Sequence, residues 1–336
     1  MPIKIPKNLP ARADLEAEGV AIITEEVAHR QDIRPMRIAL LNLMPVKMRT
    51  EREIARLLGA SPLQVELTLL TTGTYQGSNT PKDHMLTFYK TFEQVRHKRF
   101  DGLVITGAPI ETLPFEDVQY WQELRDILDW TQTNVLKTFD ICWGAQAALF
   151  HFHGVPKHEM ARKRFGIFEH SVVKKHSELL RGFDDVFRIP VSRHTENRES
   201  DLPTTSGLEM LAKSDDAGPC LIDDPAHRHT YMFNHVEYET DNLKFEYDRD
   251  CTRGVQIHIP ENYYPADDST RQPINTWRAS AHLLFANWVN LVYQHTPYDL
   301  SDLEPTPAYK AKRSVTTGPA SGSSELVHLG IGEENG

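Results

Sequence analysis

The sequence contains a cysteine at the point where an apolar segment gives way to a pattern of small residues. The segment "TFDICWGAQAALF" covers residues 138–150, and Cys142 lies between an apolar run at 135–141 and a helical pattern that begins at Trp143. A cysteine in a sharp strand-to-helix turn is accessible to substrate, and the helix N-terminus stabilises its thiolate. Taken alone, however, Cys142 is more simply explained as a buried core residue, since free cysteines are usually buried.

The residues after the cysteine fit the catalytic interpretation. Gly144 and Ala145 are small enough for the predicted helix to pack closely against the strand. The backbone amide of Trp143 is expected to point at the oxyanion that forms on the carbonyl of a bound substrate.

A second segment supplies a candidate base. In "YMFNHVEYE", residues 231–239, His235 follows an apolar strand pattern and Glu237 comes two residues later. Side chains at i and i+2 of an extended backbone share a face, so Glu237 can orient the imidazole and stabilise its cation. The other ring nitrogen can then face Cys142, which gives nucleophile, base and orienting carboxylate in chain order. A single histidine among 16 is weak evidence for a catalytic base, but a His-x-Glu segment together with Cys142 at a strand-to-helix turn predicts catalysis.

The elements that must position these residues alternate between strand and helix. Nearly continuous apolar runs predict strands buried on both faces, and amphipathic patterns between them predict helices. Thr50 is a plausible N-cap, with Glu53 three residues later and Gly59 as a stop signal. This alternation predicts an α/β fold with a doubly wound, mostly parallel sheet. The predicted strands are 36–43, 63–70, 102–106 and 135–141, and the predicted helices are 50–59, 83–98 and 116–132.

The periodicity changes after Gly154. Short strand patterns dominate as far as residue 238, and helical patterns return at 240–250 and 275–294. We therefore expect an N-terminal arm at 1–35, a single α/β domain at 36–300 with extra strands and helices in its C-terminal half, and a mobile tail at 301–336 that is rich in Pro, Gly, Ser and Glu. Ligands of doubly wound sheets gather at the carboxyl ends of the strands, where Cys142 falls. The short strand patterns are 162–174, 185–193, 208–214, 219–223 and 229–238.

Composition excludes several functional classes. The 336 residues include 37 Lys and Arg against 47 Asp and Glu, giving a formal net charge of −10, so nucleic acid is not an expected partner. Three widely spaced cysteines without a CxxC pair predict neither a disulfide framework nor a structural metal site. No signal peptide and no stretch of roughly 20 apolar residues is present, so we expect no membrane partner and a cytoplasmic location.

Several motifs carry a family resemblance. "CWGAQ" and "HVE" are similar to the Cys-x-Gly-x-Gln and His-x-Glu signatures of class I glutamine amidotransferase-like proteins, which have a flavodoxin-like fold. More specifically, the chain resembles the homoserine O-acyltransferase family of methionine biosynthesis from residue 1 to about residue 300. The segments that carry this resemblance are "MPIKIPKNLPA", "QDIRPMRIALLNLMPVKMRTE", "LVITGAPIE", "FDICWGAQAAL", "KRFGIFEH", "PVSRHTE" and "FNHVEYE".

The resemblance implies a ping-pong acyl transfer. An acyl-CoA would acylate Cys142, and the hydroxyl of L-homoserine, deprotonated by His235, would then take the acyl group. No metal and no cofactor are implied beyond the co-substrate acetyl-CoA. Lys47, in "LMPVKMRTE", would lie beside the nucleophile and join the Trp143 amide in the oxyanion hole. The alternative for Lys47 is a solvated lysine at a helix start.

The resemblance also implies that Lys163, Ser192 and Arg249 bind substrate. Glu246 and Arg249 are three residues apart on a predicted helix, so they can lie together and suit the ammonium and carboxylate of an amino acid. Without the resemblance, the pair would be explained as a surface ion pair, which is common.

The acyl group is predicted from Glu111, the residue after "TGAPI". The family divides between acetyl and succinyl donors, and Ser192 is assigned with Glu111 to this choice. A glutamate near the acyl end would repel the succinyl carboxylate, so Glu111 favours acetyl-CoA. The alternatives are homoserine O-succinyltransferase activity and an exposed loop glutamate that has no bearing on the choice.

Two other functions remain open at this stage. A glutaminase would use the same cysteine, histidine and glutamate, so those residues cannot exclude it. A non-catalytic binding module that retains the fold is a second alternative, although the intact Cys142, His235 and Glu237 argue against it. The N-terminal arm suggests a homodimer, because such an arm can lie over a partner subunit.

Overall fold

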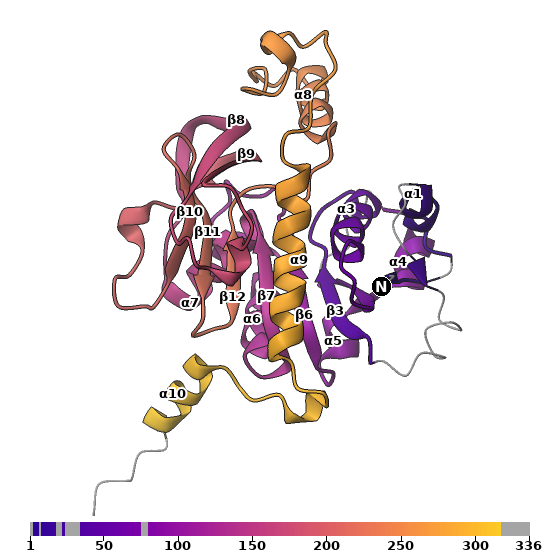
Figure 1. The fold of residues 1–336 in the computed structure, drawn as a ribbon, viewed down its shortest axis with the longest axis vertical. Coiled ribbons are helices and arrows are strands. Elements are labelled where there is room, and N and C mark those ends of the chain that lie inside the picture. Colours follow the sequence, from indigo (N-terminus) through magenta and orange to yellow (C-terminus); the bar gives the residue numbers. More distant parts are fainter. Residues whose placement is uncertain (1–2, 7, 18–21, 24–33, 75–79, 317–336) are drawn as a thin grey trace, which may run out of the picture.

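The protein forms one mixed sheet covered by helices on both faces (Figure 1). A computed structural model describes residues 3–6, 8–17, 22–23, 34–74 and 80–316. Within these ranges the sheet has twelve strands, in the order β2-β1-β4-β3-β6-β7-β12-β11-β10-β8-β9, and β5 pairs with β4. The predicted α/β class with a mostly parallel central sheet is confirmed.

The parallel half of the sheet carries the carboxyl edge on which a site can form. It consists of β4 (Val65–Thr71), β3 (Met36–Leu41), β6 (Phe100–Ile105) and β7 (Val135–Ile141), adjacent in that order. All seven residues of β7 are buried, as expected for a strand covered on both faces. Strand β12 (His229–Met232) runs parallel to β7, with Met232 beside Ile141. The segments that follow β7 and β12 therefore leave the sheet side by side.

The C-terminal half adds antiparallel strands. β11 (Gly218–Asp224) pairs with β12 and β10 (Glu209–Ser214), and β10 pairs with β8 (His158–Val172). β8 forms a long hairpin with β9 (Val186–Glu196). These strands are the extra elements that the change of periodicity after Gly154 predicts.

Two helices cover each face of the parallel half. α3 (Lys47–Gly59) and α9 (Arg278–His295) share one buried cluster with the sheet, and α6 (Trp121–Asn134) and α7 (Trp143–His153) share another. α9 crosses the sheet in Figure 1, and it packs so closely that a Cβ on Gly102 of β6 would lie 2.7 Å from the Trp288 ring. No helix within the described residues is both long enough and apolar enough to traverse a bilayer.

The N-terminal segment packs against its own chain. β1 (Ile3–Lys4) pairs with both β4 and β2 (Ile22–Ile23), so the arm extends the edge of the sheet. Helix α1 (Ala11–Ala17) packs against α3, and Leu9 and Leu15 are buried. The remaining arm residues 1–2, 7, 18–21 and 24–33 lie outside the described residues.

Two predicted helices differ from the observed ones. The helix expected at 50–59 begins at Lys47, and Thr50 and Glu53 are buried inside it instead of capping it. The helix expected at 83–98 is interrupted: α4 (Lys82–Phe88) and α5 (Phe92–Val95) flank β5 (Tyr89–Thr91). The cause is tertiary, since β5 pairs in parallel with the end of β4.

The predicted mobile tail is wrong for residues 301–316. A short turn (Leu300–Asp302) leads into α10 (Pro307–Thr316), which packs near α6. Thr306 donates through its backbone and side chain to Gln132, at 2.9 and 2.7 Å, and the Ala308 amide donates to the Ala226 carbonyl at 3.0 Å. Residues 317–336 of the predicted tail lie outside the described residues. Helix α8 (Asn242–Thr252) matches the helix expected at 240–250.

Candidate active site

Cys142 occupies a strained turn between β7 and α7. Its backbone has φ 51° and ψ −116°, a left-handed conformation that costs a non-glycine residue about 1–2 kcal/mol. The Cys142 amide donates to the Met232 carbonyl at 2.7 Å, so the end of β12 holds the turn in place. The residue is 7% exposed. A strained, nearly buried cysteine at a helix N-terminus is the arrangement expected of a nucleophile elbow.

Two glycines allow the turn to form. A Cβ on Gly144 would lie 2.7 Å from the Thr106 carbonyl oxygen, which is closer than real Cβ atoms come. A Cβ on Gly107 would lie 3.2 Å from the Cys142 Cβ and 3.6 Å from the Trp143 amide nitrogen. The predicted close packing of this helix on the sheet is confirmed. Trp143 N therefore lies beside the loop after β6, while its oxyanion role stays a prediction.

His235 reaches Cys142 because β12 runs beside β7. Its Nδ1 lies 2.8 Å from Glu237 Oε1, and the ring lies near enough to the Cys142 sulfur for their charges to interact. The His235 amide donates to the Pro190 carbonyl at 2.9 Å, which ties the segment to β9. The predicted nucleophile, base and carboxylate are thus brought together, each less than 10% exposed.

The charges around His235 favour its protonated form. Burial opposes protonation of the ring, but the charges of Cys142 and Glu237 outweigh it and raise the pKa of His235 well above its ordinary value. A protonated His235 can neutralise negative charge on the Cys142 sulfur and later give its proton to a leaving group.

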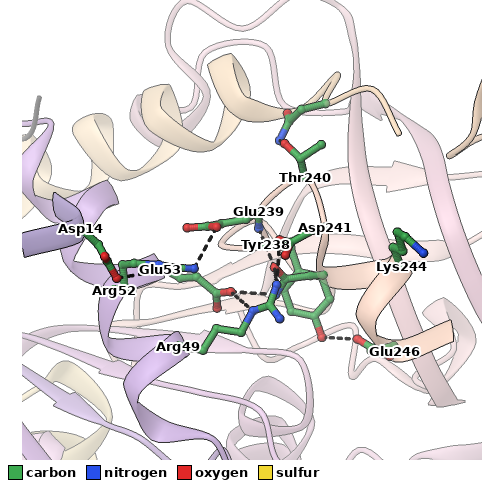
Figure 2. A network of polar contacts seen from close by, with 12 residues as sticks. Asp14, Arg49, Arg52, Glu53, Tyr238, Glu239, Thr240, Asp241, Lys244 and Glu246 are labelled. Carbon is green, nitrogen blue, oxygen red and sulfur yellow. Dashed lines mark hydrogen bonds and ion pairs between the residues drawn. The ribbon is translucent and has the colours of Figure 1, made fainter. Parts of the chain in front are cut away.

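Tyr238 is a site residue that sequence reasoning missed. Its ring stacks on the His235 imidazole with centroids 4.1 Å apart and an interplanar angle of 20°. Its hydroxyl donates to Glu246 Oε1 at 2.7 Å, as Figure 2 shows. Tyr238 therefore fixes the imidazole plane and connects it to Glu246. An aromatic residue three positions after the histidine was the available signal.

Glu246 joins two of the other predicted substrate-binding residues. Its Oε2 accepts from Ser192 Oγ at 2.6 Å and from Lys163 Nζ at 2.7 Å. Burial raises the pKa of Glu246, but Lys163 and Ser192 outweigh it and lower that pKa to about 2. Lys163 Nζ also lies 4.2 Å from the Phe165 ring centroid. Glu246 is thus a fixed negative charge in a cluster close to His235.

Glu246 and Arg249 lie three residues apart on α8, but no ion pair joins them among the described residues. Arg249 Nε instead donates to Asp250 Oδ1 at 2.7 Å, and the Arg249 side chain is 36% exposed. The reason is that Lys163, Ser192 and Tyr238 already bond to the Glu246 oxygens. Asp250, and to a smaller extent the charge of Glu246, raises the pKa of Arg249.

Lys47 is buried, which rules out the alternative of a solvated lysine. It is 8% exposed, its Nζ donates to the Asn42 carbonyl, and it lies 5.5 Å from the Tyr89 ring centroid. Burial lowers the pKa of Lys47 to about 8, and Glu51 opposes this shift. The residue lies where β3 enters α3, at the carboxyl edge that also carries Cys142. Its oxyanion role stays a prediction.

Glu111 lies on the loop after β6, at the same edge of the sheet. Lys157 Nζ donates to the Glu111 and Leu113 carbonyls. Burial lowers the pKa of Lys157, and the negative charge of Glu111 opposes this shift, so the two charges interact. The loop that carries Glu111, the residue predicted to select the donor, is therefore also bonded to the half-buried ammonium of Lys157.

A polar network joins α3 to the segment that follows His235 (Figure 2). Glu53 on α3 accepts from Arg49 Nε at 3.2 Å and from Asn242 Nδ2 at 2.7 Å. Burial and the charge of Glu237 raise the pKa of Glu53 to about 7. Glu237 Oε2 is buried and accepts no hydrogen bond from the described residues. The network also includes the ion pairs Arg49–Asp241 at 2.8 Å, Arg52–Asp14 at 3.2 Å and Arg52–Glu239 at 3.1 Å.

A cavity of about 880 Å³ borders this network. It is lined by α3, residues 236–241 and the start of α9, and it includes Glu237 and Tyr238. Cys142 and His235 do not line it, so Glu237 is the one member of the predicted catalytic group that borders this cavity.

Comparisons with known proteins identify the family of this chain. The family described as Homoserine O-succinyltransferase matches residues 2–298. A homoserine O-acetyltransferase from Chelativorans sp. is 57% identical over 303 residues, covering 90% of this chain and 97% of its own length. A homoserine O-acetyltransferase from Hyphomonas neptunium is also 57% identical, with 90% of this chain and 99% of its own length covered.

Solved structures are more distant. The crystal structure of SMU.1228c has a TM-score of 0.50 at 16% identity and covers 76% of this chain and 99% of its own. A glutamine amidotransferase from Thermotoga maritima has a TM-score of 0.48 at 13% identity, with 77% and 99% covered. At 16% identity, the likeness to SMU.1228c concerns the fold alone, and no conclusion is drawn from the second structure.

Proposed function

Because this chain belongs to the homoserine O-succinyltransferase family, we propose that it transfers an acetyl group from acetyl-CoA to the hydroxyl of L-homoserine. The observation that carries the proposal is the arrangement of Cys142 at the strained turn after β7, tied to the end of β12, with the His235–Glu237 pair on the segment that follows β12. The reaction would take place in methionine biosynthesis, in the cytoplasm, and without a metal or a bound cofactor.

The first half-reaction acylates the cysteine. The Cys142 sulfur attacks the thioester carbonyl of acetyl-CoA, and the negative charge passes to the carbonyl oxygen. The Trp143 amide and the Lys47 ammonium are the proposed donors to this oxyanion. When the intermediate collapses, the bond to the coenzyme A sulfur breaks, and protonated His235 supplies the proton that this sulfur takes.

The second half-reaction restores the enzyme. Neutral His235 removes the proton from the homoserine hydroxyl as its oxygen attacks the acetyl-cysteine carbonyl. The bond to Cys142 breaks, acetylhomoserine leaves, and the sulfur and the imidazolium return to their starting charges. Glu237 stabilises the imidazolium in both halves.

The cluster around Glu246 is the proposed homoserine site. Glu246 carries a fixed negative charge that suits the substrate ammonium, and it lies near His235 through Tyr238. Arg249 is partly exposed, and a guanidinium can bind a carboxylate bidentately. Lys163 and Ser192 hold the Glu246 carboxylate and so position it for this contact.

The choice of acyl donor is proposed to depend on Glu111 and Lys157 together. Ser192 is a third residue expected to influence this choice. The family description names succinyl, whereas the relatives at 57% identity are named acetyltransferases. Glu111 would repel a succinyl carboxylate and also compensates the charge of Lys157. Replacing Glu111 by glycine would leave Lys157 as a cation that favours the succinyl group.

Mass spectrometry after mixing the protein with one acyl-CoA at a time tests this proposal. The wild-type chain should carry an acetyl adduct on the Cys142 peptide with acetyl-CoA and far less adduct with succinyl-CoA. Glu111→Gly should form the succinyl adduct, and Glu111→Gly combined with Lys157→Met should lose most of that gain. Thr112→Gly is the matched control, because it loosens the same loop without removing a charge.

Two results would contradict the proposal. An adduct on a peptide without Cys142 would reject the nucleophile, and an unchanged donor preference in Glu111→Gly would reject the specificity argument. Glutamine hydrolysis without acetyl transfer would support the glutaminase alternative. The homodimer is a separate expectation, which light scattering of the purified protein tests.

A further inference from the structure

A second cluster of histidine and carboxylate side chains lies at the other end of α7. His153 is the last residue of this helix, Asp224 ends β11, and His227 lies in the turn between β11 and β12. Since Cys142 precedes the first residue of α7, the full length of the helix separates this cluster from the candidate active site. The three residues belong to neither the proposed catalytic group nor the proposed substrate cluster.

Two imidazoles converge on one oxygen of the Asp224 carboxylate. His153 Nε2 lies 2.7 Å and His227 Nδ1 lies 2.9 Å from Asp224 Oδ2. The two ring nitrogens and the carboxylate oxygen all lie within 4.8 Å of one another. Two imidazoles and one carboxylate are a ligand set found in zinc sites that keep a fourth position for water.

Packing fixes the orientation of these ligands. The His227 ring stacks on Phe152, with centroids 4.4 Å apart, and meets the His153 ring edge-on at 5.0 Å. Asp224 Oδ2 also accepts from the Tyr231 hydroxyl at 2.9 Å, and Asp224 Oδ1 accepts from the His227 amide at 3.1 Å. The Asp224 side chain is fully buried, whereas the His227 side chain is 18% exposed, so an ion can enter from the His227 side.

We propose that His153 Nε2, Asp224 Oδ2 and His227 Nδ1 bind one zinc ion, with water as the fourth ligand. Zinc takes nitrogen and oxygen ligands at about 2.0–2.2 Å in tetrahedral geometry, which separates them by about 3.3 Å. The two His–Asp contacts must therefore lengthen by about half an ångström, and the two ring nitrogens, which lie within 4.8 Å of each other, must reach a similar separation. Each ring moves its proton to its other nitrogen, and the metal replaces the hydrogen bonds that the rings gave Asp224.

The bound ion would cross-link α7 to the β11–β12 hairpin. It takes no part in acyl transfer, because it lies a helix length away from Cys142. The competing explanation is a metal-free cluster in which the same contacts serve only as hydrogen bonds. A direct binding measurement separates the two explanations, because only the first predicts saturable binding that depends on both histidines.

The experiment uses the full chain with Cys142→Ala, so that zinc cannot bind the catalytic thiol. The protein is stripped with a chelator and titrated with zinc chloride in a calorimeter. One equivalent should bind, and His227→Asn or His153→Gln should weaken binding by at least about 100-fold. His176→Asn is the matched control, because His176 is exposed and lies outside the cluster.

A second measurement distinguishes loss of the metal site from misfolding of a variant. Cobalt replaces zinc, and the visible spectrum should show the bands of a tetrahedral ion, which His227→Asn removes while the far-UV circular dichroism stays unchanged. The proposal is overturned if the Cys142→Ala protein shows no saturable zinc binding. It is equally overturned if both histidine variants bind as tightly as the His176→Asn control.

Discussion

At the first turn of α7, His235 Nδ1 lies 2.8 Å from Glu237 Oε1; at the last turn, His153 Nε2 lies 2.7 Å from Asp224 Oδ2. Both are pairs of a buried imidazole and a carboxylate, and both depend on residues that follow or precede β12. The pairs differ in what the imidazole faces. His235 faces a thiol, whereas His153 shares its carboxylate with a second imidazole.

The helix itself adds to this difference. Its N-terminus carries partial positive charge and stabilises an anion such as the Cys142 thiolate, while its C-terminus stabilises a cation. The first end therefore suits a nucleophile, and the last end suits a charged imidazole or a metal ion. A histidine–carboxylate pair thus acquires its role from its third partner and from the helix end at which it lies.

Cys142→Ala should have the largest effect on this comparison. We expect acyl transfer to fall by at least about 10⁴-fold, since loss of the nucleophile removes the covalent route. The fold should persist, because alanine at φ 51° is no more strained than cysteine. Steady-state kinetics and thermal unfolding measure the two effects. Cys251→Ala, at an exposed position, is the matched control and should leave both unchanged.

Exchanging the two carboxylates for amides should separate the two ends. Glu237→Gln should lower kcat by about 10²–10⁴-fold, because the imidazolium loses its charged partner. Asp224→Asn should change kcat by less than about threefold but should lower stability, since hydrogen bonds to a buried charge contribute about 1.5–3 kcal/mol. If Asp224→Asn lost activity as strongly as Glu237→Gln, the two clusters would not be functionally distinct.

The two glycines at the ends of α7 give a smaller contrast. Gly144→Ala should cost about 3 kcal/mol of unfolding free energy, because its Cβ would lie 2.7 Å from a backbone oxygen. Gly154→Ala should cost only about 1 kcal/mol, since Gly154 has φ 67° and open space around it. Urea unfolding measures both changes. Equal costs would show that the sheet tolerates a shift of the helix at its catalytic end.

Glu53→Gln should have the smallest effect, visible only in the pH dependence of stability. The pKa of Glu53 rises from 4.5 to about 7 on folding, so the native state holds a proton that the unfolded chain has lost. Stability from this group is complete below pH 4.5 and is lost as the pH rises to about 7, at no more than about 1.4 kcal/mol per pH unit. Glutamine should remove this slope.

The pKa of Asp224, at the C-terminal end of α7, is shifted in the opposite direction to that of Glu53. Burial opposes its ionisation, but His153 and His227 outweigh burial and hold the pKa of Asp224 well below its usual range. Its contribution to stability is therefore present at neutral pH and is lost as the pH falls below about 4. Urea unfolding at a series of pH values measures both effects. Glu53→Gln should change the pH dependence of the unfolding free energy between pH 4.5 and about 7, and Asp224→Asn should change it below about pH 4.

The sequence predicts the catalytic group because its signals are local. β7 and Cys142 are adjacent in the chain, and the spacing of His235 and Glu237 follows from an extended backbone. The apolar runs of β3, β4, β6 and β7 are equally readable, since a strand buried on both faces needs no polar alternation.

The errors come from contacts between distant segments. Tyr89 belongs to a strand only because the end of β4 is available to pair with it. Glu246 bonds to Lys163, which lies 83 positions earlier, a contact that the spacing of residues along α8 does not show. The helix at Pro307–Thr316 had a local signal, a proline at its first position followed by good helix formers, but the composition of the whole tail obscured it.

The short strand β1 has a practical consequence for anyone who shortens this chain. β4 has its outer side occupied in two places, by β1 at Val65 and Glu66 and by β5 at Leu69 to Thr71. Deleting residues 1–17 would leave free amide and carbonyl groups at the first place and uncover the apolar surface beneath Leu9 and Leu15. Such an open border invites strand-to-strand association between molecules, so a trimmed version should precipitate at concentrations that the intact chain tolerates.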